Sequence, residues 1–323
     1  MITTILPTFQ RPQLLKRAIQ SVLSQTFSDF ILHIHDNASQ DETEKVVSQF
    51  QDPRIKYFKG ETNIGLVQNF AHAIDQVTTP YFSFLSDDDF LLPKFYVTTL
   101  EGFEKYPTAG FSAGRTLKCN SKGKYPKDQY IHPFLDGYFL AGDALIALAE
   151  TKNFPIWTGI LFKTELVKQL GGLATQAGHA IDMELTLRVA SCTSIVVTPT
   201  PVAVLMVWKE SASKVLISMK ETNFDPLVDN VLPHFVGSAA KKEIAKRNLQ
   251  QMRIGGYRHI WIHSLLANQI ENAQAAREVF LQLGGYTHPL KLKLLKLAES
   301  NACVRKIFLI YFHSRIMLRR YGS

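Results

Sequence analysis

The chain has few of the features that mark secreted, membrane-spanning or disulfide-stabilised proteins. It contains three cysteines in 323 residues, Cys119, Cys192 and Cys303, and they are widely spaced. This pattern argues against a disulfide framework or a zinc site and is typical of a reducing compartment. No apolar run approaches the ~18–20 residues that a membrane-crossing helix needs, and residues 2–6 follow no basic or apolar leader. We therefore expect a cytoplasmic protein, either soluble or peripheral on the inner face of the cell membrane.

Acidic residues are scarce in the last quarter of the chain. Residues 241–323 hold 15 Lys and Arg against 4 Asp and Glu, whereas residues 1–240 hold 21 against 24, so the net charge of +8 originates in the C-terminal quarter. Such asymmetry favours an acidic partner surface, either phospholipid or nucleic acid; solvated surface charge is the alternative. The chain has no recognisable nucleic-acid-binding module, so we expect no nucleic-acid partner.

Strand-like and helix-like segments alternate through the first 92 residues. The expected strands are 2–6, 30–35, 54–59 and 81–85, and helical spacing of apolar residues separates them. Ser39 and Glu42 form a capping-box pattern for the helix that follows the second strand. This alternation predicts a parallel, doubly wound sheet, in which ligands lie beyond the carboxyl ends of the strands. Polar residues stand at each of those ends: Thr8–Arg11, Asp36–Asn37, Asn63 and Asp87–Asp89.

The three consecutive carboxylates Asp87–Asp89 follow the buried-strand pattern 81–85. Adjacent negative charges repel, and a hard divalent cation with oxygen ligands would offset them. The alternative is that they cap a helix that begins near Leu92.

Beyond residue 93 we expect a helix to about Tyr106, strands at 110–117 and 156–162, and helices at 142–150 and 182–190. The strand at 156–162 leads into a helix that ends at Gly171-Gly172. Residues 194–208 hold one or two strands broken by Pro199 and Pro201. Residues 119–136 are predicted to form a loop over the site. Strand patterns end near Ser211, where we place a change of domain to a helical extension.

Six stretches together resemble the family 2 glycosyltransferases, which have the GT-A fold. They cover about residues 2–210 in the order and at the spacing of that family. The stretches are Thr4–Arg11, Ser21–Phe30, His35–Asp41, Asn63–Gly65, Phe84–Asp89 and Ile181–Arg188. The resemblance implies a Rossmann-like, mostly parallel sheet flanked by helices, with a nucleotide-binding half (1–92), an acceptor half (93–210) and a basic helical extension (211–323).

The resemblance also implies an inverting enzyme that moves a sugar from a nucleotide-diphosphate donor to a hydroxyl of a glycan or lipid-linked acceptor in cell-surface polysaccharide synthesis. The expected donor is a UDP-sugar. Asp88 would bind Mn²⁺ or Mg²⁺, and Asp182 would be the general base. The remaining nucleotide-binding positions would be Pro7, Thr8, Phe9, Arg11, Asp36, Asn37, Asn63 and Asp87.

The sequence departs from the family pattern at two acidic motifs. Asn37 stands where many members have a second aspartate, and Ser86 occupies the first position of the Asp-x-Asp motif, so Asp88 is the expected ligand and Asp87 or Asp89 could assist it. Asp182 could instead be a helix N-cap.

Several other residues have alternative interpretations. Arg11 could contact phosphate or carry solvated charge, and Trp157 could stack on a sugar or belong to the core. His179 could contact the acceptor or a phosphate, although we favour a non-functional role. His33 and His35 alternate on a strand and are expected in the core or behind the site.

The sequence leaves two competing functions open. One is a catalytically inactive GT-A scaffold that binds nucleotide sugar or a partner through its basic helices. The other is a nucleotidyltransferase, which the absence of a Gly-rich phosphate loop disfavours. The basic amphipathic segments in 290–297 and 304–320 are expected to lie on an anionic membrane, or else to pack on the protein or a second subunit. We expect the acceptor pocket to be shaped by residues around 110–180.

Overall fold

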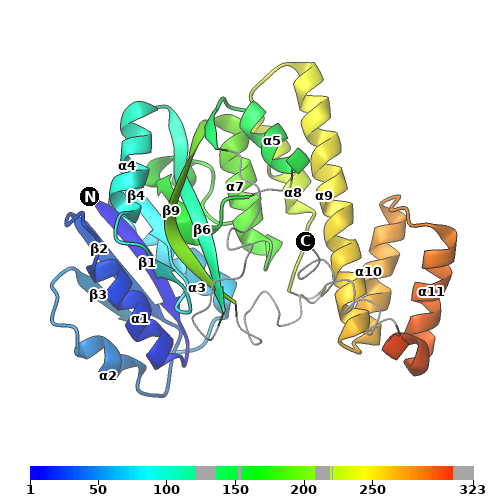
Figure 1. Ribbon diagram of the computed structural model, residues 1–323, viewed down its shortest axis with the longest axis horizontal. Coiled ribbons are helices and arrows are strands. Elements are labelled where there is room, and N and C mark those ends of the chain that lie inside the picture. Colours follow the sequence, from blue (N-terminus) through cyan, green and yellow to red (C-terminus); the bar gives the residue numbers. More distant parts are fainter. Residues whose placement is uncertain (121–135, 152–153, 208–218, 220, 308–323) are drawn as a thin grey trace, which may run out of the picture.

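The computed structural model describes residues 1–120, 136–151, 154–207, 219 and 221–307. Within these residues a nine-stranded mixed sheet flanked by helices forms one end of the molecule, and helices alone form the other end (Figure 1). The strands are β1 (Ile2–Thr8), β2 (Phe30–Asp36), β3 (Ile55–Lys59), β4 (Tyr81–Phe84), β5 (Phe90–Leu91), β6 (Ala109–Asn120), β7 (Gly137–Phe139), β8 (Ile160–Lys163) and β9 (Ser194–Val207).

The first four strands form a parallel half-sheet in the order β3-β2-β1-β4, as the alternation of the sequence predicts. β1 is buried along its whole length; Ile5 belongs to one core cluster, and Ile2 and Leu6 belong to the other. The carboxyl ends of β1, β2 and β4 therefore meet at one edge of the sheet. The connecting helices are α1 (Pro12–Leu23), α2 (Thr43–Ser48) and α3 (Leu66–Asp75).

The second half of the sheet is mixed. β8 lies antiparallel between β4 and β6, and β6 pairs in parallel with β9. The segment 156–162, expected to be one strand, begins as the 3₁₀ turn η1 (Trp157–Gly159) and becomes β8 only at Ile160. β9 is one strand across Pro199 and Pro201. Pro199 lies in the gap between the pairs Ala113–Val197 and Arg115–Pro201, and register shifts against β6 flank Pro201, so both prolines stand where the ladder is irregular.

The expected capping box before α2 is wrong. The helix begins at Thr43, whose amide donates to Asp41 Oδ1 at 2.9 Å. Ser39 lies before the N-cap position of α2, which is Glu42. The amide of Ser39 instead donates to Asp36 Oδ1 at 2.9 Å and holds the turn after β2.

The remaining helices surround the second half-sheet and form the C-terminal end. They are α4 (Phe95–Lys105), α5 (Asp143–Thr151), α6 (Thr164–Gln169), α7 (Ile181–Cys192), α8 (Pro226–Asp229), α9 (Ala239–Leu266), α10 (Ile270–Gln282) and α11 (Pro289–Ser300), with the 3₁₀ turns η2 (Thr175–Ala177) and η3 (Leu232–His234). Gly171 and Gly172 follow α6 with φ of +91° and +70°, as expected for a glycine helix end. Most of the loop expected at 119–136, and the amphipathic segment beyond residue 307, lie outside the described residues.

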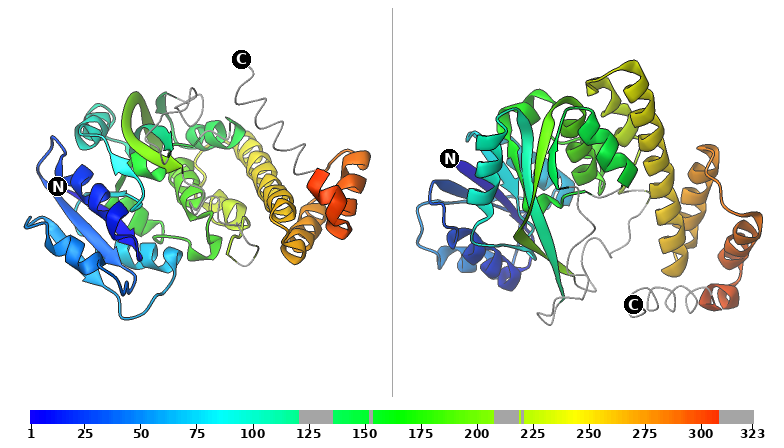
Figure 2. Two further views of the ribbon diagram at one scale, coloured as in Figure 1. Left: turned by 60° about the horizontal axis from the view of Figure 1, so that its bottom comes forward. Right: turned by 45° about the horizontal axis from the view of Figure 1, so that its top comes forward.

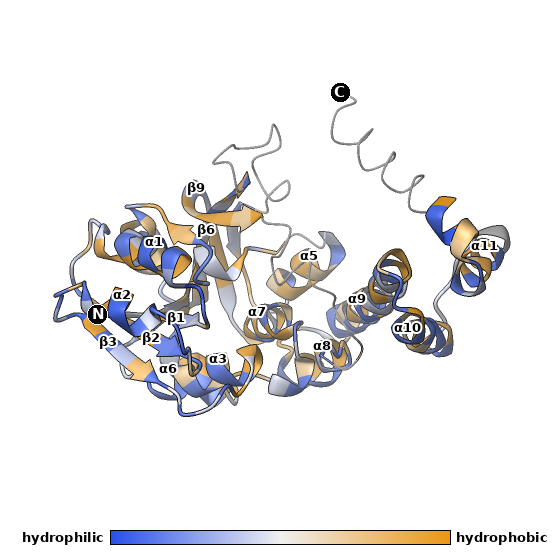
Figure 3. Ribbon diagram, turned by 90° about the horizontal axis from the view of Figure 1, so that it is seen from below, coloured by the Kyte–Doolittle hydropathy of each residue, from blue (hydrophilic) through white to orange (hydrophobic). Residues whose placement is uncertain are grey.

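The long helix α9 lies between the sheet end of the molecule and the pair α10–α11 (Figure 2). The larger core cluster continues from the sheet through α5 and α7 into α9 and α10, where Trp261 and Phe280 are buried. Each of α9, α10 and α11 carries both apolar and polar residues (Figure 3). In the described part of the chain, no helix combines the length and apolar character that crossing a bilayer requires.

Candidate active site

A cavity of about 380 Å³ opens at the carboxyl ends of β1, β2 and β4. Eight of the nine residues that the sequence assigned to nucleotide or metal binding at this end of the sheet line its wall. They are Pro7, Thr8, Phe9, Arg11, Asn37, Asn63, Asp87 and Asp88. The structure thus brings together residues from four segments that are separated by up to 81 positions in the chain.

Asp36 is the ninth of these residues, and it does not line the cavity. Its side chain is buried, with Oδ1 accepting from the Ser39 amide and Oδ2 accepting from the Tyr57 hydroxyl at 2.5 Å. The geometry gives Asp36 a supporting place behind the wall, where it fixes the turn that carries Asn37.

Two asparagine side chains form the part of the wall next to this turn. Asn37 Nδ2 donates to Asn63 Oδ1 at 2.7 Å, and Asn37 Oδ1 accepts from the Ile64 amide at 2.9 Å. Asn63 Oδ1 also accepts from the Gly65 amide at 2.9 Å. These bonds connect the end of β2 to the start of α3 and orient both amides at the cavity.

Asp87, Asp88 and Asp89 occupy three different environments. Asp87 accepts from the Thr8 hydroxyl at 2.8 Å and from Arg11 Nη1 at 3.4 Å. Asp89 turns to the other side, where it accepts from the Thr158 hydroxyl at 2.8 Å and from the Met206 amide at 2.9 Å.

None of the three aspartates caps a helix, so the capping alternative is wrong. The strand β5 follows them directly, and α4 starts only at Phe95, with Lys94 at its N-cap and no side-chain cap.

The three carboxyl groups are electrostatically distinct. Burial raises the pKa of Asp87 to about 6, against the opposing effects of Arg11 and the Thr8 hydroxyl. Burial and the neighbouring Asp88 raise the pKa of Asp89 to about 8. Burial also raises the pKa of Asp88, with Arg11 opposing it. Crowded carboxylates in a partly buried site favour the binding of a cation.

Asp88 is the carboxylate that fits a divalent cation bound together with a ligand diphosphate. It lines both this cavity and a second one, and its Oδ2 lies 3.7 Å from Arg11 Nη1. Mg²⁺ is commonly bound by one or two carboxylates together with substrate phosphates. Among the residues described, no cluster of three or more His, Cys, Asp or Glu could hold an ion by itself. Phosphate oxygens would therefore have to supplement Asp88. Asp89 lines the second cavity beside Asp88, but both of its oxygens already accept hydrogen bonds, from the Thr158 hydroxyl and the Met206 amide.

The second cavity has a volume of about 650 Å³ and adjoins the first. Four residues line both: Leu66, Phe70, Ser86 and Asp88. Asp182 lines the second cavity, so Asp88 and Asp182 border one space. Asp182 is the second residue of α7 and not its N-cap, which is Ala180.

The Asp182 carboxyl is exposed to the cavity but surrounded by protein. Its removal from bulk water raises its pKa, against the opposing effect of the Met183 amide, which donates to Oδ1 at 2.7 Å. Trp157 stacks on Phe84 with ring centroids 4.2 Å apart, and its Nε1 donates to the Asp182 carbonyl oxygen at 3.1 Å. Trp157 is thus both a core aromatic and part of the cavity wall.

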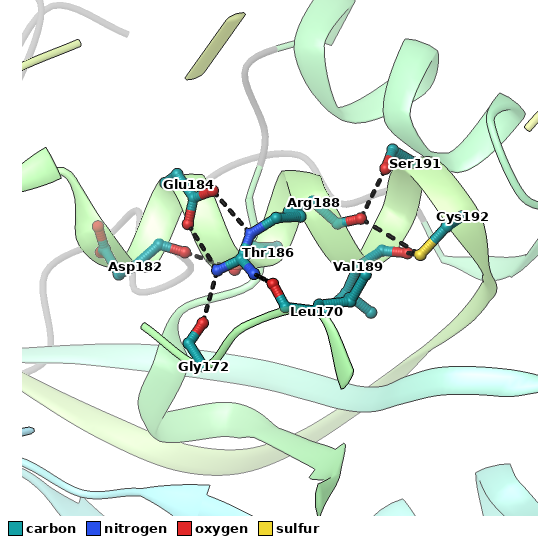
Figure 4. A network of polar contacts seen from close by, with 9 residues as sticks. All are labelled: Leu170, Gly172, Asp182, Glu184, Thr186, Arg188, Val189, Ser191 and Cys192. Atoms are coloured by element: carbon teal, nitrogen blue, oxygen red, sulfur yellow. Dashed lines mark hydrogen bonds and ion pairs between the residues drawn. The ribbon is translucent and has the colours of Figure 1, made fainter. Parts of the chain in front are cut away.

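A buried polar network anchors α7 and so positions Asp182 (Figure 4). Arg188 Nε donates to Glu184 Oε1 at 2.7 Å, and its Nη2 donates to the carbonyl of Gly172 at 2.6 Å. A further bond reaches the carbonyl of Leu170. The Ile181–Arg188 motif therefore combines three cavity residues, Asp182 among them, with an arginine whose hydrogen bonds join α7 to the end of α6.

Sequence reasoning missed the part of this cavity that comes from α9. Met252, Gly255, Gly256, Arg258 and His259 all line the cavity, although we expected residues around 110–180 to shape it. A signal was available in the sequence, because a Gly-Gly pair inside a helical pattern usually has a packing or functional reason.

The fold and the paired cavities define a GT-A glycosyltransferase architecture. The model of "Glycosyl transferase family 2" matches residues 3–171, and the chain belongs to this family.

Curated relatives resemble parts of the chain. A stretch of 94 residues is 39% identical to the GalNAc(5)-diNAcBac-PP-undecaprenol beta-1,3-glucosyltransferase of Campylobacter jejuni, covering 28% of this chain and 30% of that protein. A stretch of 140 residues is 29% identical to the putative colanic acid biosynthesis glycosyl transferase WcaA of Escherichia coli, covering 40% of this chain and 50% of that protein. The matches thus span half or less of these two relatives.

Solved structures share the fold over most of the chain. Residues 1–349 of S. aureus TarS in complex with UDP-GlcNAc match with a TM-score of 0.62 at 17% identity, covering 89% of this chain and 93% of that one. The mannosyltransferase PcManGT of Pyrobaculum calidifontis, in complex with GDP-Man and Mn²⁺, matches with a TM-score of 0.54 at 17% identity and covers 96% of this chain and 87% of that one.

Proposed function

We propose that this protein is an inverting glycosyltransferase that transfers a sugar from a nucleotide-diphosphate donor, a UDP-sugar, to a hydroxyl of a glycan or lipid-linked acceptor in cell-surface polysaccharide synthesis. The observation that carries the proposal is that Asp88 borders two adjoining cavities and that Asp182 borders the second. The UDP-GlcNAc complex of TarS and the undecaprenol-linked substrate in the name of the Campylobacter relative support the donor and acceptor classes.

The first cavity would hold the nucleotide. The side-chain amides of Asn37 and Asn63 can form hydrogen bonds with the edge of a base. The Thr8–Asp87 pair can form hydrogen bonds with the hydroxyl groups of a ribose. Arg11, which is 41% exposed at its side chain, can pair with phosphate. A cation bound by Asp88 and the diphosphate would offset the charge on the leaving group.

The second cavity would hold the acceptor hydroxyl next to the donor sugar. As the acceptor oxygen attacks the anomeric carbon, its proton passes to Asp182, and the bond from that carbon to the diphosphate oxygen breaks. Attack from the side opposite the leaving group inverts the anomeric centre. The raised pKa of Asp182 suits a general base, because proton transfer is most effective when the pKa lies near the working pH.

The test separates binding from turnover. We expect Asp182→Asn to retain the thermal stabilisation by UDP with Mn²⁺ and to lower the rate of sugar transfer by ~10²–10⁴-fold. We expect Asp88→Asn to lose the Mn²⁺-dependent part of the stabilisation. The measurements are thermal shift and UDP release across a panel of UDP- and GDP-sugars.

Other outcomes of this test would identify the competing functions. UDP-sugar binding without turnover by the wild type would identify a catalytically inactive scaffold. Release of pyrophosphate would identify a nucleotidyltransferase.

We also propose that the C-terminal helices bring the enzyme to an anionic membrane surface. On α11, Leu294 and Leu297 are 41% and 47% exposed, and the exposed Lys293 and Lys296 lie beside them on the same face. Leucine and lysine side chains on one exposed face suit the boundary between lipid headgroups and acyl chains.

A further inference from the structure

The wall that α9 contributes to the second cavity carries a positive charge. Arg258 is the only Lys or Arg among the described residues that line this cavity. No carboxylate of the described residues forms an ion pair with it, whereas Arg253, one turn earlier, pairs with Asp225 at 2.7 Å. A guanidinium with free donors at the wall of a cavity is suited to bind an anion.

His259 stands next to Arg258 on the same wall. Burial, His263 and Arg258 lower the pKa of His259 to about 4, so its imidazole is neutral at physiological pH. A neutral imidazole retains one N–H donor. Arg258 and His259 therefore present hydrogen-bond donors to this part of the cavity without a second fixed charge.

The rest of the wall is largely apolar. This part of the wall is formed by Phe154, Trp157, Phe224 and Met252. The cavity has a volume of about 650 Å³, which is within the range of small-molecule sites. Gly255 leaves part of the wall open, because a Cβ built there meets no atom within 4 Å. A molecule in this space would meet apolar surface, the cation of Arg258 and the carboxyl groups of Asp88, Asp89 and Asp182.

We propose that Arg258, with His259 beside it, binds a phosphate group of the acceptor. This inference rests on the proposed function and adds that the acceptor carries a phosphate or diphosphate near the hydroxyl that reacts. Arginine forms paired hydrogen bonds with phosphate oxygens, so the contact would orient the acceptor as well as hold it. Such a phosphate could belong to a prenyl diphosphate carrier or to a water-soluble sugar phosphate.

The experiment measures binding to the full chain with the donor cavity already filled. Protein saturated with UDP and Mn²⁺ is titrated calorimetrically with farnesyl diphosphate and, separately, with N-acetylglucosamine 1-phosphate. We expect binding of at least one probe, weakened about tenfold or more in Arg258→Gln because a charge-assisted bond is lost. Arg258→Lys should restore part of the affinity by restoring the charge. Arg247→Gln is the matched control, because Arg247 is exposed on the same helix but does not line the cavity.

Filling the open part of the wall gives a second, independent measure. Gly255→Leu should abolish probe binding by occupying the cavity, whereas Gly255→Ala should retain it. Both variants should keep the wild-type stabilisation by UDP, which shows that they are folded and that the donor cavity is intact.

Each outcome supports or overturns the inference. Binding of farnesyl diphosphate alone identifies a lipid carrier, and binding of both probes identifies recognition of the phosphate itself. Failure of both probes to bind, or equal binding by wild type and Arg258→Gln, overturns the inference. Failure of UDP to stabilise the wild type would instead overturn the proposed function.

Discussion

His33 and His35 show how strongly burial sets the chemistry of a single residue in this protein. Both are buried on β2, and the His35 ring stacks on Phe58 with centroids 4.7 Å apart. Burial, with His33 and His72 nearby, lowers the pKa of His35 to about 4, and burial and Lys56 lower the pKa of His33. As expected from the sequence, these histidines belong to the core behind the site.

The lowered pKa predicts acid sensitivity that begins well above the ordinary pKa of a solvent-exposed carboxylate. Below pH ~6.5 the unfolded chain binds a proton at His35 that the folded protein binds only near pH 4. The free energy of unfolding should thus fall as the pH drops through this window, by up to ~3 kcal/mol from His35. His35→Phe keeps a ring against Phe58 and removes the titration, so the slope of stability against pH should flatten by up to one proton. Urea unfolding at pH 4.5, 5.5 and 6.5 measures the slope; an unchanged slope would contradict the assignment.

The sequence indicated where the aspartates of the site stand, but it could not divide their roles. Asp87, Asp88 and Asp89 are adjacent and chemically identical. Their roles differ because Thr8, Thr158 and the Met206 amide, all remote in the chain, pair with two of them. The sequence likewise predicts that Asp36 contacts the nucleotide, because it does not reveal that Tyr57 of the neighbouring strand β3 pairs with the Asp36 carboxylate. A residue pattern fixes the type of side chain, whereas tertiary contacts decide which atoms remain available.

At the scale of elements, α9 carries two adjacent glycines that face different surroundings. A Cβ at Gly256 would lie 2.5 Å from the Phe224 ring, whereas a Cβ at Gly255 would meet nothing within 4 Å. The first glycine allows α9 to pack against the segment before α8, and the second leaves the cavity open.

This difference predicts opposite effects for the same substitution. Gly256→Ala should destabilise the protein by about 1–3 kcal/mol, because the Phe224 ring must move. Gly255→Ala should stabilise it by about 0.5–1 kcal/mol, because alanine loses less conformational freedom in a helix. Equilibrium urea unfolding of the two variants checks this, each serving as the control for the other. Equal effects of both substitutions would contradict the packing described for α9.

The alternation of β1 to β4 with α1 to α3 followed from local patterns, and the structure confirms it. Local patterns failed where long-range pairing decides the outcome. β9 continues through two prolines because β6 tolerates the irregularity, and η1 replaces the start of a predicted strand. The two-residue strand β5 exists only through its pairing with β9, so no local signal could have revealed it.

At the scale of the whole molecule, the C-terminal helices are part of the main core and not an appendage. The larger core cluster includes residues of the sheet together with Trp261 of α9 and Phe280 of α10. The change from strands to helices after β9 agrees with the composition near residue 211, and a domain boundary there stays a prediction. Because α9 lines the second cavity, its packing on the sheet also completes the candidate site.

The surface of α11 that we propose to face the membrane is separate from the two cavities. α11 packs through Leu295 and Ala298, which are 2% and 1% exposed, so the face with Lys293, Leu294, Lys296 and Leu297 points away from that contact. We expect the protein to float with vesicles that contain phosphatidylglycerol and not with pure phosphatidylcholine vesicles.

Reversing two charges on this face provides the sharpest test at this scale. A lysine near an anionic surface contributes about 1 kcal/mol, so Lys293→Glu with Lys296→Glu should weaken vesicle binding by roughly tenfold or more. Lys242→Glu with Lys246→Glu makes the same change in net charge on exposed positions of α9 and is the matched control. If both double variants lose binding equally, overall charge and not α11 attracts the membrane. If neither loses binding, the basic face of α11 has another partner, because a contact made by that face could not survive the reversal of its charges.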